Sequence, residues 1–140
     1  MKKNLFLCLL LFSNSSFSSY QFETVLDNLD DAWSFVFLSE DKILYTEMPG
    51  KLKIASLSDK TIKNIDNVPS VQYGGQGGLS EVALDPEFES NQKIYFSYSS
   101  KDKNGKSTLF LSSAELRNNA LVNSRVIFKA NAPRRSPVHL

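Results

Sequence analysis

A repeated unit of short strand-like segments constrains the fold of this chain more than any other feature. Residues 34–46 match residues 80–97, with Ser34 aligned to Ser80 and Thr46 to Ser97, at offsets of about 46 to 51 residues. Two further segments have counterparts, 51–54 in 108–111 and 61–69 in 125–133. Apolar and polar side chains alternate in these segments, which is typical of β-strands. Each unit therefore predicts four short strands.

Four-stranded units of this length indicate a β-propeller, in which each blade is buried against its neighbours around a central channel. About two blades fit in the 140 residues of the chain, whereas a closed ring needs at least about four. We therefore expect an all-β fold in which residues 19–140 are the N-terminal part of a larger propeller. A complete β-sandwich is the alternative, because about 120 residues can enclose one core.

The N-terminus has the layout of a secretory signal peptide. Lys2 and Lys3 precede an apolar run at residues 5–12 and a polar tail of small residues. The run is too short to span a bilayer. We expect cleavage after Ser18 and a periplasmic or secreted protein; a buried N-terminal strand is the alternative. Cys8, the only cysteine, lacks the preceding small residues of a lipoprotein signal, so we expect no lipid anchor and no disulfide in the mature chain.

The charge of the chain points to no charged macromolecular partner. The formal net charge is +1, and acidic and basic residues are interspersed. This pattern does not favour nucleic-acid binding. Arg134 and Arg135 form an adjacent basic pair, which is more typical of a solvated loop than of a ligand site. No second long apolar run follows the signal, so we expect no membrane anchor.

The connections between blades are the expected location of a site. In a propeller the outermost strand of one blade leads to the innermost strand of the next, and these connections emerge on one face. Here one connection spans residues 70–78, and the next begins at Arg134. Gln76 and His139 occupy equivalent places in the two connections. The repeat therefore predicts that both side chains point toward one central pocket, because loops on a rigid scaffold often carry function.

The glycine-rich loop at residues 74–78 lacks the GxGxxG spacing and leads into a strand, so neither a dinucleotide site nor a P-loop is indicated. Four glycines in five residues either allow close approach of a ligand or supply positive φ in a tight turn, and the tight turn is favoured. Gln76 is the one side chain of the loop, and its amide can both donate and accept hydrogen bonds.

His139 is the only histidine of the chain and has the residue type best suited to a general base near neutral pH. Glu47 is interpreted as a structural carboxylate of a turn or an edge, and Trp33 as a packing aromatic. Asp85 is interpreted as a turn residue. No His-x-x-x-His motif or acidic cluster indicates a metal site by itself.

At these residues the sequence resembles the soluble sugar dehydrogenases that depend on pyrroloquinoline quinone (PQQ), the glucose/sorbosone dehydrogenases, and within them the aldose sugar dehydrogenase type. WSFVFLSEDKILYTEMPGKLKI is similar to the first-blade block of that family and GGQGGLSEVALDPEFESNQKIYFSYS to its second-blade block. RVIFKANAPRRSPVHL looks like the approach to its catalytic histidine. The resemblance implies a six-bladed propeller with PQQ in the central pocket.

Carried over to this sequence, the resemblance implies that Gln76 contacts the cofactor. It implies that His139 takes a proton from the anomeric hydroxyl of an aldose sugar while hydride passes to the quinone. The remaining arginine and asparagine of the family's pocket, and its calcium ligands, would lie beyond Leu140. The chain by itself is therefore expected to be an inactive fragment, and the electron acceptor is not identified.

Two alternatives stay open. The first is a non-catalytic extracellular propeller that binds a ligand without a cofactor, which is mildly favoured by Val138, where related sequences often have a polar residue. The second is a calcium-dependent lactonase propeller, which would require carboxylate metal ligands that the sequence does not display.

Overall fold

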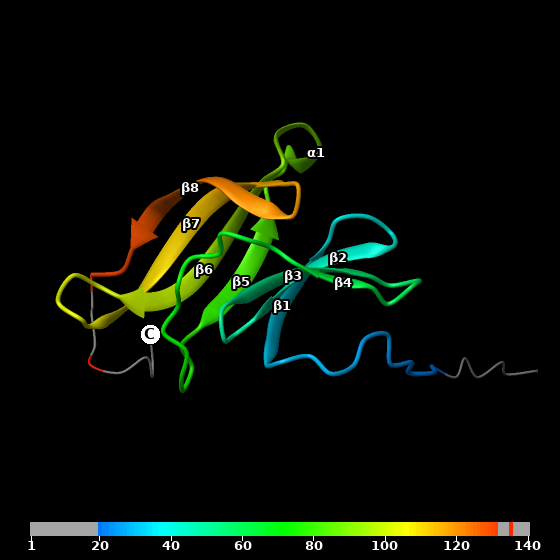
Figure 1. Cartoon of the computed structure of the whole chain (residues 1–140), viewed down its shortest axis with the longest axis horizontal. Helices are drawn as coiled ribbons and strands as arrows, with labels where there is room; N and C mark the ends of the chain where they lie inside the picture. The colour runs from blue at the N-terminus through cyan, green and yellow to red at the C-terminus, as the bar shows by residue number, and fades with distance from the viewer. Residues whose placement is uncertain (1–19, 132–134, 136–140) are drawn as a thin grey trace, which may run out of the picture.

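The fold consists of two four-stranded antiparallel sheets that follow one another in the chain (Figure 1). It is described here from a computed structural model, for residues 20–131 and 135. The first sheet, blade 1, contains β1 (Ala32–Phe37), β2 (Lys42–Glu47), β3 (Lys51–Ser56) and β4 (Ile62–Asn64). The second, blade 2, contains β5 (Leu79–Leu84), β6 (Lys93–Lys101), β7 (Ser107–Arg117) and β8 (Ala120–Lys129). The predicted all-β fold of four-stranded antiparallel units is confirmed.

Turn chemistry explains where the strands end. Gly50 closes the β2–β3 turn at φ +105°, and Gly105 closes the β6–β7 turn at φ +73°, conformations that glycine adopts without a steric penalty. Two features were not expected from the sequence. The turn between β5 and β6 contains one turn of helix, α1 (Phe88–Asn91), and the β7–β8 hairpin uses Asn118 and Asn119, both at positive φ. Asparagine tolerates this conformation better than most residues.

The pairing of the inner strands corrects the match between the two units. Tyr45 pairs with Phe35, and its counterpart Phe96 pairs with Val82, so the inner strands correspond at an offset of 47 residues. The match of Ser34 with Ser80 is therefore wrong by one residue, and a shift of one residue exchanges the two faces of a strand. Both inner strands carry an irregularity at the same place, before Phe35 and before Val82. The equivalent positions are Trp33 and Ser80, Ser34 and Glu81, Phe35 and Val82, Tyr45 and Phe96, and Glu47 and Tyr98.

The two blades pack face to face along an interface that we call the seam. Its buried residues come from both sheets and their connection: Leu44, Leu52, Ile65, Leu79, Val82, Ile94, Phe96, Tyr98, Ala114, Leu116 and Leu121. Phe96 and Leu44 are 1% and 0% exposed. Fully burying a side chain of this size contributes about 1.5–3 kcal/mol. The seam therefore holds the two blades in a fixed relation, with β1 beside β5.

A buried hydroxyl adds a polar link across the seam. Thr46 is fully buried, and its Oγ1 donates a hydrogen bond of 2.7 Å to the carbonyl oxygen of Ser80. Thr46 Oγ1 also accepts a hydrogen bond of 3.1 Å from the backbone N–H of Ser34. Ser34 Oγ in turn accepts one of 3.3 Å from the N–H of Val82. The inner strands of the two blades are thus joined by hydrogen bonds as well as by packing.

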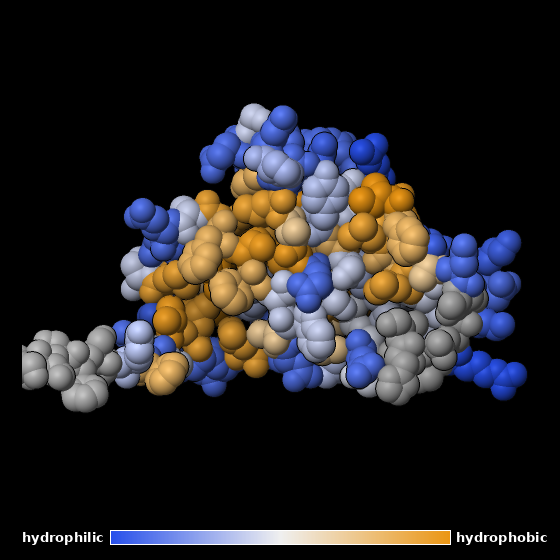
Figure 2. Space-filling model, turned by 180° about the vertical axis from the view of Figure 1, so that it is seen from behind, coloured by the Kyte–Doolittle hydropathy of each residue, from blue (hydrophilic) through white to orange (hydrophobic). Residues whose placement is uncertain are grey.

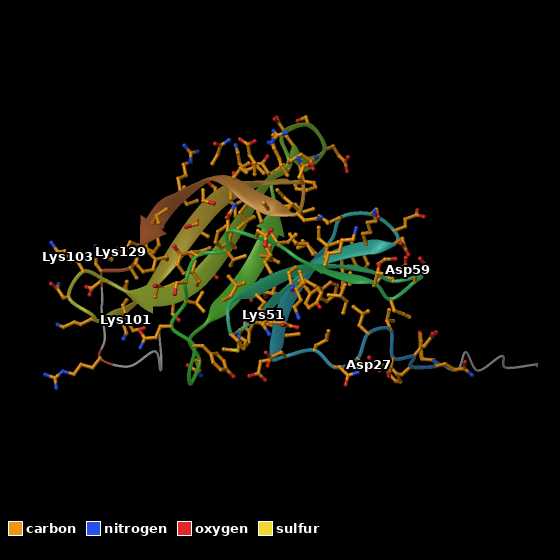
Figure 3. All side chains as sticks on the ribbon, viewed as in Figure 1. Asp27, Lys51, Asp59, Lys101, Lys103 and Lys129 are labelled. Atoms are coloured by element: carbon orange, nitrogen blue, oxygen red, sulfur yellow. The ribbon has the colours of Figure 1, made fainter. Side chains whose placement is uncertain are left out.

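The opposite face of blade 1 exposes apolar side chains. Phe35 and Phe37 meet edge to face, with ring centroids 5.7 Å apart, yet both are more than half exposed. Figure 2 shows apolar surface on the side of the molecule that carries blade 1. The labelled charges of Figure 3 lie on turns, strand ends and the segment before β1. Exposed apolar area of this kind marks a surface that another structure covers.

The expected signal peptide, residues 1–18, lies outside the described residues. Within the described part of the chain, no helix has the length and apolar character needed to span a bilayer.

Candidate cofactor-binding site

The connection from β4 to β5 carries the glycine-rich loop and is seated on the β2–β3 turn. The N–H of Leu79 donates a hydrogen bond of 2.9 Å to the carbonyl oxygen of Met48. Gly78 lies so close to this carbonyl that a Cβ atom would be 2.3 Å from its oxygen. At the other end of the turn, a Cβ on Gly50 would be 2.8 Å from Val71 Cγ2. The loop can therefore lie on the turn only with glycine at position 78 of the loop and at position 50 of the turn.

The tip of the loop is a closed two-residue turn. Gly74 and Gly77 exchange backbone hydrogen bonds of 3.1 and 2.9 Å, which leaves Gly75 and Gln76 at the tip. Gly75 has φ +58°, the positive value that such turns favour at this position. The tight-turn interpretation of the glycines is confirmed. Gln76 is held on a short rigid turn and its side chain is exposed to solvent.

A concavity of about 360 Å³ lies beside this tip at the inner edge of the two blades. It is lined by Trp33, Gln76, Ser80, Glu81, Ser99 and Leu109. No residue among those described hydrogen-bonds the Gln76 amide, so its donor and acceptor are free toward this space. Gln76 therefore lies beside this concavity, just before the second inner strand.

Trp33 and Glu81 also line the concavity, and the sequence pointed to neither as a candidate site residue. Trp33 was expected to be a packing aromatic, but it is 54% exposed and its Nε1 donates a hydrogen bond of 3.1 Å to Glu81 Oε1. This bond joins β1 to β5 across the seam. Within the described part of the chain Trp33 is not buried, and its expected role as a packing residue stays a prediction. Its place at the start of the innermost strand, the same edge as Gln76, was the available signal.

Glu47 supports the turn on which the loop sits. It was expected to be a structural carboxylate of a turn or an edge; it is the last residue of β2, at this turn, and is 0% exposed. Its Oε1 accepts hydrogen bonds from Lys53 Nζ at 2.8 Å and from the Asp30 N–H at 3.2 Å. The N–H of the next residue, Met48, bonds the Asp31 carbonyl at 3.0 Å. A buried carboxylate is stable when it is paired in this way, and here the pairing fixes the segment before β1.

A second contact joins that segment to the glycine-rich loop. The hydroxyl of Tyr73, the residue before Gly74, donates a hydrogen bond to Asp31 Oδ2. The pKa of Tyr73 is raised, first by this hydrogen bond and then by the charge of Asp31, since both favour the protonated phenol. Glu47, Asp31 and Tyr73 therefore link the β2–β3 turn, the segment before β1 and the glycine-rich loop that carries Gln76.

Asp85 behaves as the turn residue that was predicted. Its carboxylate accepts hydrogen bonds from the Tyr95 hydroxyl, the Asn91 side chain and the Glu87 N–H, which lower its pKa to about 2. The group closes the turn that contains α1. It lies at the opposite end of β5 from the concavity, so it has no part in the site.

His139 and Val138 lie outside the described residues, so the predicted meeting of Gln76 and His139 stays a prediction. Among residues 20–131 and 135, no three His, Cys, Asp or Glu side chains gather closely enough to hold a metal ion. We therefore assign no calcium ligand within this part of the chain.

The donor set of the concavity fits part of a quinone cofactor. An amide at Gln76, hydroxyls at Ser80 and Ser99 and an indole face at Trp33 suit a planar molecule with carbonyl oxygens. Glu81 is the one charged residue of the lining and has the same sign as the carboxylates of PQQ. The described residues thus fit the planar body of the cofactor, and its carboxylates require cationic partners from elsewhere.

Comparison with known proteins identifies related chains. The family described as "Glucose / Sorbosone dehydrogenase" matches residues 29–140. The aldose sugar dehydrogenase YliI of Escherichia coli K12 is 34% identical over 85 residues, which cover 60% of this chain and 23% of that protein. The crystal structure of a glucose dehydrogenase superimposes with a TM-score of 0.74 at 33% identity. The match covers 80% of this chain and 33% of the glucose dehydrogenase chain.

A third likeness shows the fold alone, because its identity is low. The PQQ-bound form of an aldose sugar dehydrogenase from Streptomyces coelicolor superimposes with a TM-score of 0.64 at 19% identity, covering 80% of this chain and 36% of that one. The chain thus spans about a third of the length of the solved structures that it matches. The family match extends over most of the sequence and includes the loop that carries Gln76. The chain belongs to the glucose/sorbosone dehydrogenase family.

Proposed function

We propose that the intact protein is an exported PQQ-dependent aldose sugar dehydrogenase that oxidises the anomeric hydroxyl of its substrate. The observation that supports this most is the position of Gln76. A rigid glycine turn presents its free amide to a concavity at the inner edge of two blades, in a chain of the sugar dehydrogenase family. The family's name gives the reaction class, and the site gives a place for a planar polar ligand.

The residues of this chain bind the cofactor and move one proton. Gln76 donates and accepts hydrogen bonds at the polar edge of the ligand, and the contacts that link its loop to the β2–β3 turn keep the amide in place. His139, in the next connection, accepts the proton of the anomeric O–H as a neutral imidazole. PQQ, when bound, would supply the two-electron oxidant for this step: it would take the hydrogen of the anomeric carbon as hydride, and the sugar would become a lactone.

Export and calcium complete the proposal. Residues 1–18 direct the chain to the periplasm or outside the cell, where the mature protein has no cysteine. Calcium, if held as the family resemblance implies, takes its ligands from residues other than those described. The six-bladed ring is likewise proposed for the whole protein, of which blades 1 and 2 are the first.

The direct test is sugar oxidation by the intact protein, supplied with PQQ and calcium and coupled to a reducible dye. We expect turnover that depends on PQQ. His139→Ala should lower kcat by about 10²- to 10⁴-fold, the usual contribution of a positioned general base. The thermal stabilisation given by PQQ should be retained in that variant, because the imidazole acts on the sugar rather than on the cofactor.

Two results would contradict the proposal. Wild-type turnover in His139→Ala would remove the assigned base. Absence of any PQQ-dependent oxidation by the wild-type protein would instead favour a propeller that binds ligands without catalysis.

A further inference from the structure

Trp33 is a large aromatic residue, and more than half of its surface is exposed in this structure. It is the only tryptophan in the 140 residues, and 54% of its surface is accessible. It is the second residue of β1, the innermost strand of blade 1, and it lines the same concavity as Gln76. Ligand pockets are lined mainly by hydrophobic and aromatic side chains, so an exposed indole at a concave site is suited to a ligand contact.

The indole is also fixed in orientation. Its Nε1 donates to Glu81 Oε1 across the seam, at a separation of 48 residues in the chain. Glu81 is itself anchored, because its backbone N–H donates a hydrogen bond of 3.1 Å to Ser97 Oγ on the neighbouring strand. An exposed tryptophan that is held by a charged acceptor is ordered before any ligand arrives, which reduces the entropic cost of binding.

The position of blade 2 that is equivalent to Trp33 has no aromatic side chain. Ser80 corresponds to Trp33, and both residues line the same concavity. Among the described residues, the aromatic surface of the concavity therefore comes from blade 1 alone. Ser34, which corresponds to Glu81, is used for hydrogen bonds within the seam. The Trp33 and Glu81 pair is thus not explained by the packing that the repeat requires.

We propose that Trp33 forms an aromatic wall against which the planar cofactor lies, and that Glu81 is the positioning residue that holds the indole in place. This inference rests on the proposed function, because it takes PQQ as the occupant. The stacking of an aromatic pair strengthens binding about two- to twelvefold beyond the effect of the area that it buries.

Fluorescence of Trp33 tests the contact without any measurement of activity. The intact protein and its Trp33→Phe variant are titrated with PQQ, and free and bound PQQ are measured independently by equilibrium dialysis. The difference in emission between the two proteins is the signal of Trp33. We expect PQQ to quench this difference signal with the same midpoint as the dialysis curve.

Substitutions at Trp33 and Glu81 separate stacking from charge. Trp33→Ala should raise the Kd for PQQ about three- to tenfold, and Trp33→Phe, which keeps a ring, should restore most of the loss. Glu81→Ala should release the indole, which makes Trp33 more accessible to acrylamide and raises the Kd. Glu81→Gln keeps an acceptor for the indole but removes the negative charge, so PQQ should bind at least as tightly as in the wild type.

The outcomes distinguish this inference from the proposed function. If dialysis shows that wild-type protein binds PQQ while the Trp33 signal is unchanged and Trp33→Ala binds equally well, the aromatic wall is wrong and the function stands. If Trp33→Ala does not fold, quenching in the wild type still decides the matter. If the wild-type protein binds no PQQ, both the inference and the proposed function are overturned.

Discussion

Blades 1 and 2 are alike where they pack and different where they meet the concavity. Tyr45 and Phe96, at equivalent positions, are 2% and 1% exposed. Tyr45 lies between Phe35 and Lys53 on the neighbouring strands, and Phe96 lies between Val82 and Ser112. At the start of the inner strands the likeness ends, because Trp33 in blade 1 corresponds to Ser80 in blade 2.

The comparison shows which parts of the repeat are constrained by packing. Each blade needs one face that fits the blade before it, so apolar residues recur at those positions. The inner-strand starts and the connections face the channel, where burial imposes no common residue type. Differences between blades at those places therefore point to function, and similarities point to stability.

The largest expected effect is on packing in the seam. Phe96→Ala should lower the free energy of unfolding by about 3–5 kcal/mol, because it leaves a cavity between the blades. Urea unfolding of the intact protein measures this loss. A cost below about 1 kcal/mol would show that blade 2 does not pack on blade 1 through this side chain.

Phe37→Ala tests the opposite face of blade 1. A similar loss in the free energy of unfolding would show that another blade covers that face, as the proposed ring requires.

The next effect concerns the loop that carries Gln76. Gly78→Ala would place a Cβ 2.3 Å from the Met48 carbonyl oxygen, so the loop must shift. Overpacking of this kind costs about 1–3 kcal/mol, and we expect weaker PQQ binding as well. Gly105→Ala is the matched control, because it also has positive φ but its Cβ would meet nothing within 4 Å. Equal melting temperatures for the two variants would contradict the close contact.

Equivalent hydroxyls test the polar link across the seam. Thr46→Val keeps the shape of the side chain but leaves the Ser80 carbonyl and the Ser34 N–H without their partner. We expect a loss of about 1–3 kcal/mol. Ser97→Ala removes the corresponding hydroxyl of blade 2, which among the described residues accepts one bond, from the Glu81 N–H. Urea titration measures the loss in the free energy of unfolding for both variants. A smaller loss for Ser97→Ala than for Thr46→Val would support the link, and a larger loss would refute it.

The smallest expected effect is a decrease in the stability of the fold at acidic pH. The pKa of Asp85 is lowered to about 2, first by the Tyr95 hydroxyl and then by Asn91. A lowered folded-state pKa means that the carboxylate stabilises the fold above its ordinary pKa near 3.9, and this contribution is lost as the pH falls from about 4 to about 2. Asp85→Ala should therefore melt below the wild type at pH 5 and converge with it near pH 2. Parallel melting curves across this range would contradict the assignment.

Local patterns predicted the elements of the fold, whereas contacts between distant residues decided what the pattern left open. Alternation around Phe35 and Phe96 predicted strands, and the glycines around Gln76 predicted a tight turn. The irregularity before Phe35 shifts the register by one residue, and nothing local announces it. Glu47 is buried only because Lys53 and the Asp30 backbone meet it, and those contacts depend on the folded arrangement.

The site was predictable in part for the same reason. Gln76 could be found because its loop is distinctive and its place follows from the repeat. Trp33 was assigned to packing, because strand patterns do not show which residue at the start of an inner strand faces the channel. Its contact with Glu81 depends on two strands from different blades.

Binding of PQQ by Gln76 variants tests the central claim most directly. Equilibrium dialysis of the intact protein should give a Kd for Gln76→Ala about 5- to 100-fold above that of the wild type, since a lost hydrogen-bond partner at a ligand costs about 1–3 kcal/mol. Gln21→Ala, in the exposed segment before β1, is the matched control and should bind as the wild type does. Equal affinity of Gln76→Ala and the wild type for PQQ would contradict the claim that this loop forms the cofactor site.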